Sequence, residues 1–230
     1  MTKFQRISIP ENLTEIAYQE IKERILNFDL KPGYKITQEE LSSVLGISTT
    51  PIREAIKRLE VEGLIQIIPR VGAYVSKFSE KDVVDTYNLR EMLEGFAGKL
   101  SCSLLKEEDF EHLQILVTKA REAARAKAII PYSANASDFH LYIVEKCGNE
   151  RLITFYKNIY SLIKIIRYQN LQLPNDIDVD FKEHINIINV LQNENPEKVE
   201  YFLREHVRGV KERILKLIEI NQETDFSIRN

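Results

Sequence analysis

The sequence predicts a mainly α-helical protein with an N-terminal winged helix-turn-helix, which includes a small β-hairpin wing, and a C-terminal antiparallel bundle made only of helices. Two observations predict this fold class. Residues 35–75 combine two short helical patterns, a glycine between them and two strand-like segments joined by a turn. Residues 80–221 keep apolar residues at helical spacing, interrupted only by short breaks. Because 43% of the 230 residues are apolar, both parts can form packed cores.

The first of the two short helices is predicted over residues 38–45, and Gly46 can end it in the left-handed conformation. A second helix begins in residues 48–51, Ser-Thr-Thr-Pro, where hydroxyls can cap the helix and proline fits its first turn. Gly63 ends that helix, and the two wing strands are predicted at residues 64–68 and 73–75. In a winged helix-turn-helix the second helix enters the major groove of DNA.

The domain organisation follows from the segments on either side. Residues 13–28 are a predicted helix whose apolar side would brace the helix-turn-helix. Ser79 can cap a new helix that has Asp82 in its first turn, so the domain boundary falls there. The predicted division is a flexible arm at 1–12, the winged helix-turn-helix domain at 13–76, a linker at 77–80, the helical domain at 81–222 and a tail at 223–230.

Short breaks divide the helical domain into antiparallel helices. The predicted helices cover about 80–104, 107–128, 132–147, 150–171, 178–193 and 196–221. The breaks fall at residues 106–107, 130–131, 148–149, 173–175 and 195–196.

Charge and composition bound the function. The formal net charge is −3, and residues 1–76 carry equal numbers of basic and acidic side chains, so DNA binding must come from a locally basic face. Cys102 and Cys147 lack metal or redox spacing, so we expect them to be buried in a reducing cytosol. No apolar run reaches the roughly 20 residues of a membrane span, and residues 1–12 lack the apolar core of a secretion signal. We therefore expect a cytoplasmic protein.

Arg90 lies in the middle of an apolar stripe on the first helix of the bundle. A buried guanidinium needs a partner, because an unpaired buried charge is very costly. Two partners fit the sequence. One is Glu94, a helical turn further on, and the other is an anionic ligand, because arginine recognises carboxylates through paired hydrogen bonds.

Three histidines lie on the apolar stripes of three different predicted helices: His140, His184 and His206. They are either structural core residues or the ligands of a divalent metal of the Zn, Ni or Fe type, to which facing bundle helices can present three imidazoles. An alternative function follows from the second possibility. A metal-activated water, with Glu183 or Glu205 as the base, would make the bundle a metal-dependent hydrolase, but it would leave the winged helix without a role.

Residues 13–76 also contain a series of short segments in a characteristic order: Leu30-Lys31-Pro32-Gly33, Leu41 to Leu45, Ser48 to Ala55, Arg58-Leu59, Glu62-Gly63-Leu64 and Pro69-Arg70-x-Gly72. Together they closely resemble the DNA-binding domain of GntR-type bacterial transcription regulators. The helical domain is similar in length and helix order to the effector-binding FCD domain of the FadR-type branch. The resemblance implies a ligand-responsive regulator and not an enzyme, acting as a homodimer on an inverted repeat of double-stranded DNA.

The resemblance also implies which residues contact DNA. The positions that match family contacts in the turn before the recognition helix and in its first turn are Ser48, Thr49, Thr50 and Arg53. Hydroxyls can bind phosphates or base edges, and Arg53 can hold a guanine with two hydrogen bonds. Many relatives have arginine where this chain has Thr49, which should alter base preference or reduce affinity. Further contacts are implied at the strand before the helix and at the wing: Lys35, Arg70 and Gly72.

A metal site is implied in the helical domain. Many FadR-type domains hold a metal with an Asp-x-x-x-His helix and with one histidine on each of two later helices. The matching pairs here are Phe139-His140, Glu183-His184 and Glu205-His206. The aspartate position is Ala136, which cannot coordinate, so the implied ligands are His140, His184 and His206, with water or effector in the fourth place and with Zn, Ni or a similar metal.

The family also implies what the regulator responds to. A small carboxylate would fit both the metal and Arg90, so we expect a metabolite of this class as the effector. In the family, repression that a ligand relieves is the commoner behaviour, which favours a repressor.

Overall fold

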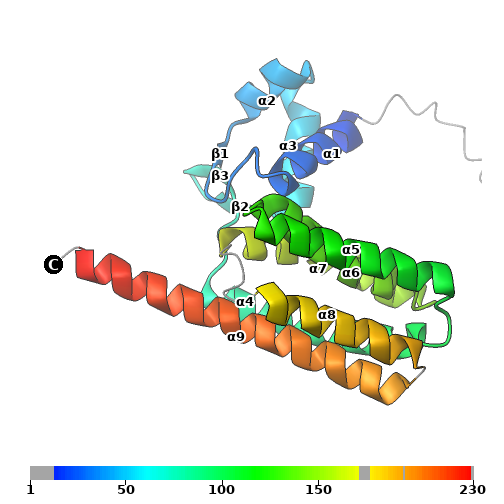
Figure 1. Ribbon diagram of the computed structural model, residues 1–230. Coiled ribbons are helices and arrows are strands. Elements are labelled where there is room, and N and C mark those ends of the chain that lie inside the picture. Colours follow the sequence, from blue (N-terminus) through cyan, green and yellow to red (C-terminus); the bar gives the residue numbers. More distant parts are fainter. Residues whose placement is uncertain (1–12, 171–176, 194, 229–230) are drawn as a thin grey trace, which may run out of the picture. The chain divides into compact units, whose positions relative to one another are not determined.

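The computed structural model describes residues 13–170, 177–193 and 195–228, and the chain divides into two compact units between Lys77 and Phe78. The predicted fold class is confirmed, because a small sheet follows the first helices and every secondary-structure element described in the second unit is a helix (Figure 1). The first unit contains α1 (Leu13–Leu26), β1 (Lys35–Ile36), α2 (Gln38–Leu45), α3 (Thr49–Val61), β2 (Ile65–Ile68) and β3 (Gly72–Val75). The second contains α4 (Glu80–Ser101), α5 (Glu107–Arg125), α6 (Ile129–Glu145), α7 (Glu150–Gln169), α8 (Ile177–Gln192) and α9 (Pro196–Ile228).

The sheet of the first unit has the strand order β1-β3-β2, and both pairs are antiparallel. The hairpin of β2 and β3 is the predicted wing. The third strand, β1, pairs Lys35 with Tyr74 and Ile36 with Ala73. Two residues are too few to show the alternating pattern of a strand, so the sequence alone does not reveal how β1 is paired.

The two short helices begin and end where the sequence predicts. The hydroxyl of Thr37 accepts a hydrogen bond from the backbone N–H of Glu40 at the start of α2, and Gly46 ends α2 with a φ of 66°. Ser48 is the N-cap residue of α3, but its hydroxyl makes no capping hydrogen bond. The buried face of α3 packs against α1, and this packing fixes the direction of the recognition helix.

The helices of the second unit differ from the prediction mainly at their ends. The capping box of Ser79 and Asp82 is present at the start of α4, as expected. Helix α6 begins at Ile129, a few residues before the predicted start, because Pro131 occupies its first turn, where no backbone donor is needed. Helix α9 continues to Ile228. The predicted arm at 1–12 and the break at 173–175 lie outside the described residues.

Helices α4 and α9 pack along each other in the bundle (Figure 1). Gly98 permits this approach, since a Cβ atom there would lie 2.1 Å from Cδ1 of Leu203 and 2.9 Å from Cγ1 of Val199. The close packing brings the inner faces of the two helices together. These faces carry buried polar residues, among them Arg90 on α4 and His206 on α9.

Both cysteines, Cys102 and Cys147, are buried, as expected. Among the described residues, no helix combines the length and the apolar character that a bilayer span requires.

Candidate metal centre and nucleic-acid interface

The three predicted histidines meet inside the bundle. His140 comes from α6, His184 from α8 and His206 from α9, and all three side chains are buried. Each offers a ring nitrogen, and these nitrogens lie within 4.8 Å of one another. The ring centroids are 4.6 to 5.3 Å apart. Residues far apart in the sequence therefore present one cluster of metal-binding nitrogens.

A different oxygen faces Nδ1 of each ring. The distances are 2.9 Å from His140 to Oε2 of Glu94, 2.8 Å from His184 to the backbone oxygen of Asp180, and 2.8 Å from His206 to Oε2 of Glu183. Nδ1 thus makes a hydrogen bond in His184 and His206, whereas Nδ1 of His140 lies close to the carboxylate oxygen without a hydrogen bond among the described residues. Because an oxygen faces Nδ1 of each ring, Nε2 is the nitrogen that remains to bind a metal. Oxygen partners of this kind orient imidazole ligands in metal sites.

The protonation of the rings suits a metal. Burial lowers the pKa of His184 to about 4 and the pKa of His140 well below its ordinary value, although Asp180 and Glu94 act in the opposite direction. Both rings are therefore neutral near pH 7 and keep a lone pair. Within the described part of the chain, Nε2 of His184 is buried without a hydrogen-bond partner. An unsatisfied buried nitrogen between two other imidazoles fits a divalent cation of the Zn or Ni type.

No carboxylate replaces the family aspartate on α6. Ala136 is buried one turn before His140 and packs in an apolar cluster that includes Tyr132. The amide of Asn135 donates to the backbone oxygen of Pro131, and Asp138 accepts a hydrogen bond from Tyr160. The protein ligands that remain are the three imidazoles.

Arg90 has the protein partner that the sequence offered. Its Nε donates to Oε1 of Glu94 at 2.6 Å, and the hydroxyl of Tyr156 donates to the same oxygen at 2.6 Å. Burial opposes ionisation of Glu94, but Arg90 and His140 hold the pKa of Glu94 below its usual range. Nη1 of Arg90 has no hydrogen-bond partner among the described residues, so the guanidinium is only partly satisfied. The anionic ligand that the sequence left open therefore still has a donor available.

Two contacts of the site were missed by the sequence analysis. Oε2 of Glu94 lies 2.9 Å from Nδ1 of His140, and the hydroxyl of Tyr156 donates to Oε1 of Glu94. Helical spacing predicted the pairing of Arg90 with Glu94, but no pattern in the sequence links α4 to α6 or α7. The position of Glu94 and Tyr156 on otherwise apolar helix faces was the only feature of the sequence that could have indicated these contacts.

A small pocket opens beside the cluster, between α5, α6 and α8. Its lining includes Arg121, Tyr132, Asp180, Phe181 and His184. Arg121 pairs with Asp178 at 2.5 Å and lies 4.2 Å from the centroid of the Phe181 ring. His184 therefore forms part of the wall of this pocket.

The predicted DNA contacts lie on the surface of the first unit. Ser48, Thr49, Thr50 and Arg53 are exposed at the start of α3. Arg70, also exposed, has a φ of 65° in the wing turn, and Gly72 follows with a φ of 146°. A Cβ atom at Gly72 would lie 3.1 Å from Cε of Lys35, so the lysine side chain runs along the wing backbone. The structure thus brings Lys35 and Gly72 together.

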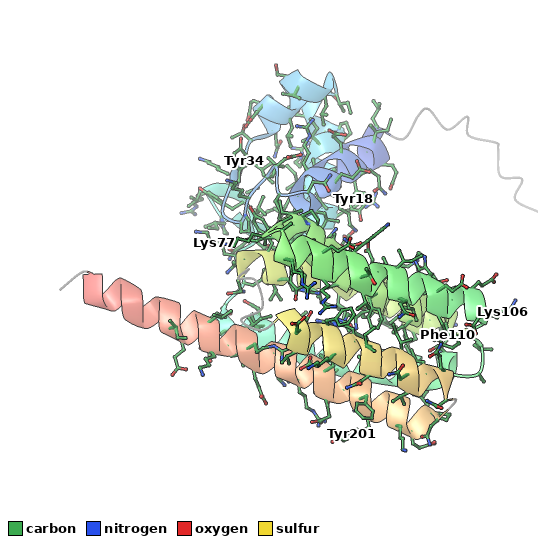
Figure 2. All side chains as sticks on the ribbon, in the orientation of Figure 1. Tyr18, Tyr34, Lys77, Lys106, Phe110 and Tyr201 are labelled. Carbon is green, nitrogen blue, oxygen red and sulfur yellow. The ribbon has the colours of Figure 1, made fainter. Side chains whose placement is uncertain are left out.

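The cationic side chains of α3 differ in whether a carboxylate pairs with them. Arg58 binds Glu15 at 2.7 Å, and its guanidinium carbon lies 4.0 Å from the centroid of the Tyr18 ring. Tyr18 is labelled in Figure 2. Lys57 binds Glu54 at 3.2 Å. By contrast, no carboxylate from the described residues pairs with Arg53. An unpaired cation at the start of a recognition helix is available to a phosphate or a guanine.

The two carboxylates named as bases for the alternative hydrolase are already paired with other side chains. Glu205 is exposed and pairs with Arg208, and Glu183 faces Nδ1 of His206 and Arg213. Neither side chain is positioned as a free base beside the cluster.

The chain matches two family models. "Bacterial regulatory proteins, gntR family" matches residues 13–75, and "FCD domain" matches residues 85–209. The HTH-type transcriptional regulator YdhC of Bacillus subtilis (strain 168) is 28% identical over 90% of this chain and 92% of its own length. The HTH-type transcriptional repressor RspR of Escherichia coli (strain K12) is 22% identical over 97% of this chain and 98% of its own. These relatives and families are transcription regulators, not enzymes.

Solved structures share the fold. E. coli McbR/YncC has a TM-score of 0.75 at 20% identity and covers 89% of this chain and 97% of its own. A structure described as the metal-free FCD domain of TM0439 has a TM-score of 0.53 at 20% identity and covers 63% of this chain and 99% of its own. At these identities the likeness concerns the fold alone.

Proposed function

Because this chain belongs to the gntR family of bacterial transcription regulators, in the branch that carries an FCD domain, and binds DNA, we propose that it acts in the cytoplasm as a homodimeric repressor. A small carboxylate metabolite releases it from an inverted-repeat operator. The observation that carries the ligand response is the buried cluster of His140, His184 and His206 close to a partly satisfied Arg90. A relative named as a repressor, RspR, favours this direction of control.

We assign DNA recognition to the start of α3 and to the wing. Arg53 reads a guanine, while Ser48, Thr49 and Thr50 bind phosphates or base edges. The hydroxyl of Ser48 makes no capping hydrogen bond, which supports this role. Lys35, Arg70 and Gly72 form the second contact, in which two cations and an approachable backbone meet the duplex beside the groove. With Arg58 and Lys57 already paired, few cations of this unit are left to provide affinity.

A single winged helix spans too few base pairs to specify a genomic site, so two copies are needed. An apolar patch on the second unit supports a two-fold contact between copies. Leu89, Met92 and Phe96 are exposed at helical spacing on α4, and Phe155 is exposed on α7, which packs against α4. A second copy presenting the same patch would bury both surfaces.

The three imidazoles would hold a divalent cation such as Zn or Ni, with the fourth position left for water or effector. When bound, the cation supplies positive charge and accepts a carboxylate oxygen. Charge supports a link between metal and anion. Arg90 and Glu94 already neutralise each other, so a lone carboxylate would bring an unbalanced negative charge into the core. A carboxylate beside a divalent cation does not have this penalty.

Release from DNA then depends on unequal binding. The effector must bind more tightly to the arrangement of helices that does not fit the operator, because a ligand with equal affinity for both arrangements changes nothing. The helices that carry the three histidines also build the core of the unit, so a change at the cluster alters their packing.

The first prediction concerns Arg53. Replacing Arg53 by Ala should weaken operator binding by about 1–3 kcal/mol, because a paired contact to guanine is lost. Lys57→Ala is the matched control, since it removes the same charge one turn further along α3 from a side chain paired with Glu54. Fluorescence anisotropy with operator DNA measures both. Equal losses in the two variants would contradict the assignment of base reading to Arg53.

The second prediction concerns the dimer. Met92→Glu should shift sedimentation equilibrium toward the monomer, because it buries an unpaired charge in the proposed interface. Ile115→Glu places the same charge at an exposed apolar residue of α5 and should leave the mass unchanged. A dimer that persists in Met92→Glu would show that the contact lies elsewhere.

The third prediction concerns the metal. The native protein should contain close to one divalent metal per chain by elemental analysis, and His184→Ala should lose it. His112→Ala should retain the metal, because His112 is exposed on α5, where its ring lies tilted against Tyr142. If His184→Ala keeps its metal, the ion is bound at another place, and if the native protein neither contains nor takes up Zn, Ni or Mn, the histidines are structural.

A further inference from the structure

Helix α4 carries a second buried donor beside Arg90 that no described residue accepts from. Tyr87 is fully buried, and among the described residues its hydroxyl has no hydrogen-bond partner. Tyr87 lies one helical turn before Arg90, and the guanidinium carbon of Arg90 is 5.2 Å from the centroid of its ring. One buried turn therefore presents two adjacent unused donors, the hydroxyl of Tyr87 and Nη1 of Arg90.

Two other buried donors of the same network do have an acceptor. Nε of Arg90 and the hydroxyl of Tyr156 both donate to Glu94. Tyr156 and Tyr87 are both fully buried tyrosines, and they differ in that only the hydroxyl of Tyr156 has a protein acceptor among the described residues. A buried donor without an acceptor is costly. Oε2 of Glu94 also lacks a hydrogen-bond partner among the described residues, but neither donor is bonded to it in this arrangement, so the pair on α4 calls for an acceptor that enters from outside.

The chemistry of the two donors defines that acceptor. A phenol O–H and a guanidinium N–H both donate, and the cation favours an acceptor with negative charge. A carboxylate offers two oxygens, one for each donor. The ring of Tyr87 packs in an apolar cluster with Val83, Ile166, Val207 and Ile214, so its surroundings supply no further charge. The acceptor that fits the two donors is therefore a single anionic group.

We propose that Tyr87 and Arg90 together form the subsite for the carboxylate head of the effector. The hydroxyl of Tyr87 donates to one carboxylate oxygen, and Nη1 of Arg90 donates to the other. This inference rests on the proposed ligand response and extends it to a residue, Tyr87, that was not among the predicted contacts. Because the hydroxyl of Tyr87 needs an acceptor, it contributes to binding the anionic head of the effector. Other residues determine which effector is bound.

The experiment compares three tyrosine-to-phenylalanine variants of the full-length protein after loading with Zn(II). Acetate, glycolate and succinate are titrated into each by calorimetry, and thermal unfolding is recorded without anion. In Tyr87→Phe, carboxylate affinity should fall roughly tenfold, because a hydrogen bond to a charged group is lost. The anion-free variant should unfold at the same temperature as the parent or higher, since an unsatisfied hydroxyl has been removed.

Two controls separate this effect from general damage. Tyr142→Phe removes a hydroxyl that donates to Asp109, away from the site, and should keep the affinity of the parent. Tyr156→Phe should lower the unfolding temperature, because Glu94 loses a hydrogen bond. The size of that fall shows what removing a hydrogen-bonded buried hydroxyl costs.

Three results would overturn the subsite. They are equal carboxylate affinity in Tyr87→Phe and the parent, a fall in unfolding temperature as large as that of Tyr156→Phe, and no binding of any of the three carboxylates to the zinc-loaded parent. Elemental analysis of the same samples reports on the three histidines separately. Metal lost from the parent counts against the proposed metal centre, whereas retained metal with unchanged affinity counts against Tyr87 alone.

Discussion

The buried ion pair between Arg90 and Glu94 is the interaction on which the second unit depends most. Both side chains are 1% exposed, so each charge has lost its water and relies on the other. Removing one partner of such a pair typically costs about 3–5 kcal/mol, because the other charge remains buried alone. Glu94 also accepts from Tyr156 and faces His140, so the pair ties α4 to α6 and α7. The pair therefore faces one ring of the histidine cluster, that of His140.

Periodicity predicted which residues face inward, but not which of them touch. The spacing of apolar residues placed His140, His184, His206 and Arg90 on inner faces, and cap residues such as Gly46 and Ser79 marked helix ends correctly. The contact of Glu94 with His140 depends on how closely α4 and α6 approach each other. The spacing of apolar residues within one helix does not reveal that distance. The pairing of β1 was missed for a related reason, since its two residues form a strand by pairing with β3, which lies far along the sequence.

The first unit shows how a neutral domain can still present a basic contact surface. Several of its acidic residues form ion pairs within the unit: Glu15 with Arg58, Glu54 with Lys57 and Glu62 with Lys22. These pairs brace helices and leave Arg53 and the wing with their charges available. Local pairing, and not the total charge, therefore decides where DNA can bind.

The central claim is that metal and carboxylate bind the second unit together, and thermal unfolding tests it most directly. The full-length protein is melted with and without Zn(II), each with and without acetate, alongside His184→Ala. Our account predicts that acetate raises the melting temperature only when zinc is bound, and has no effect on the metal-free protein or the variant. An equal rise without zinc, or in His184→Ala, would contradict it.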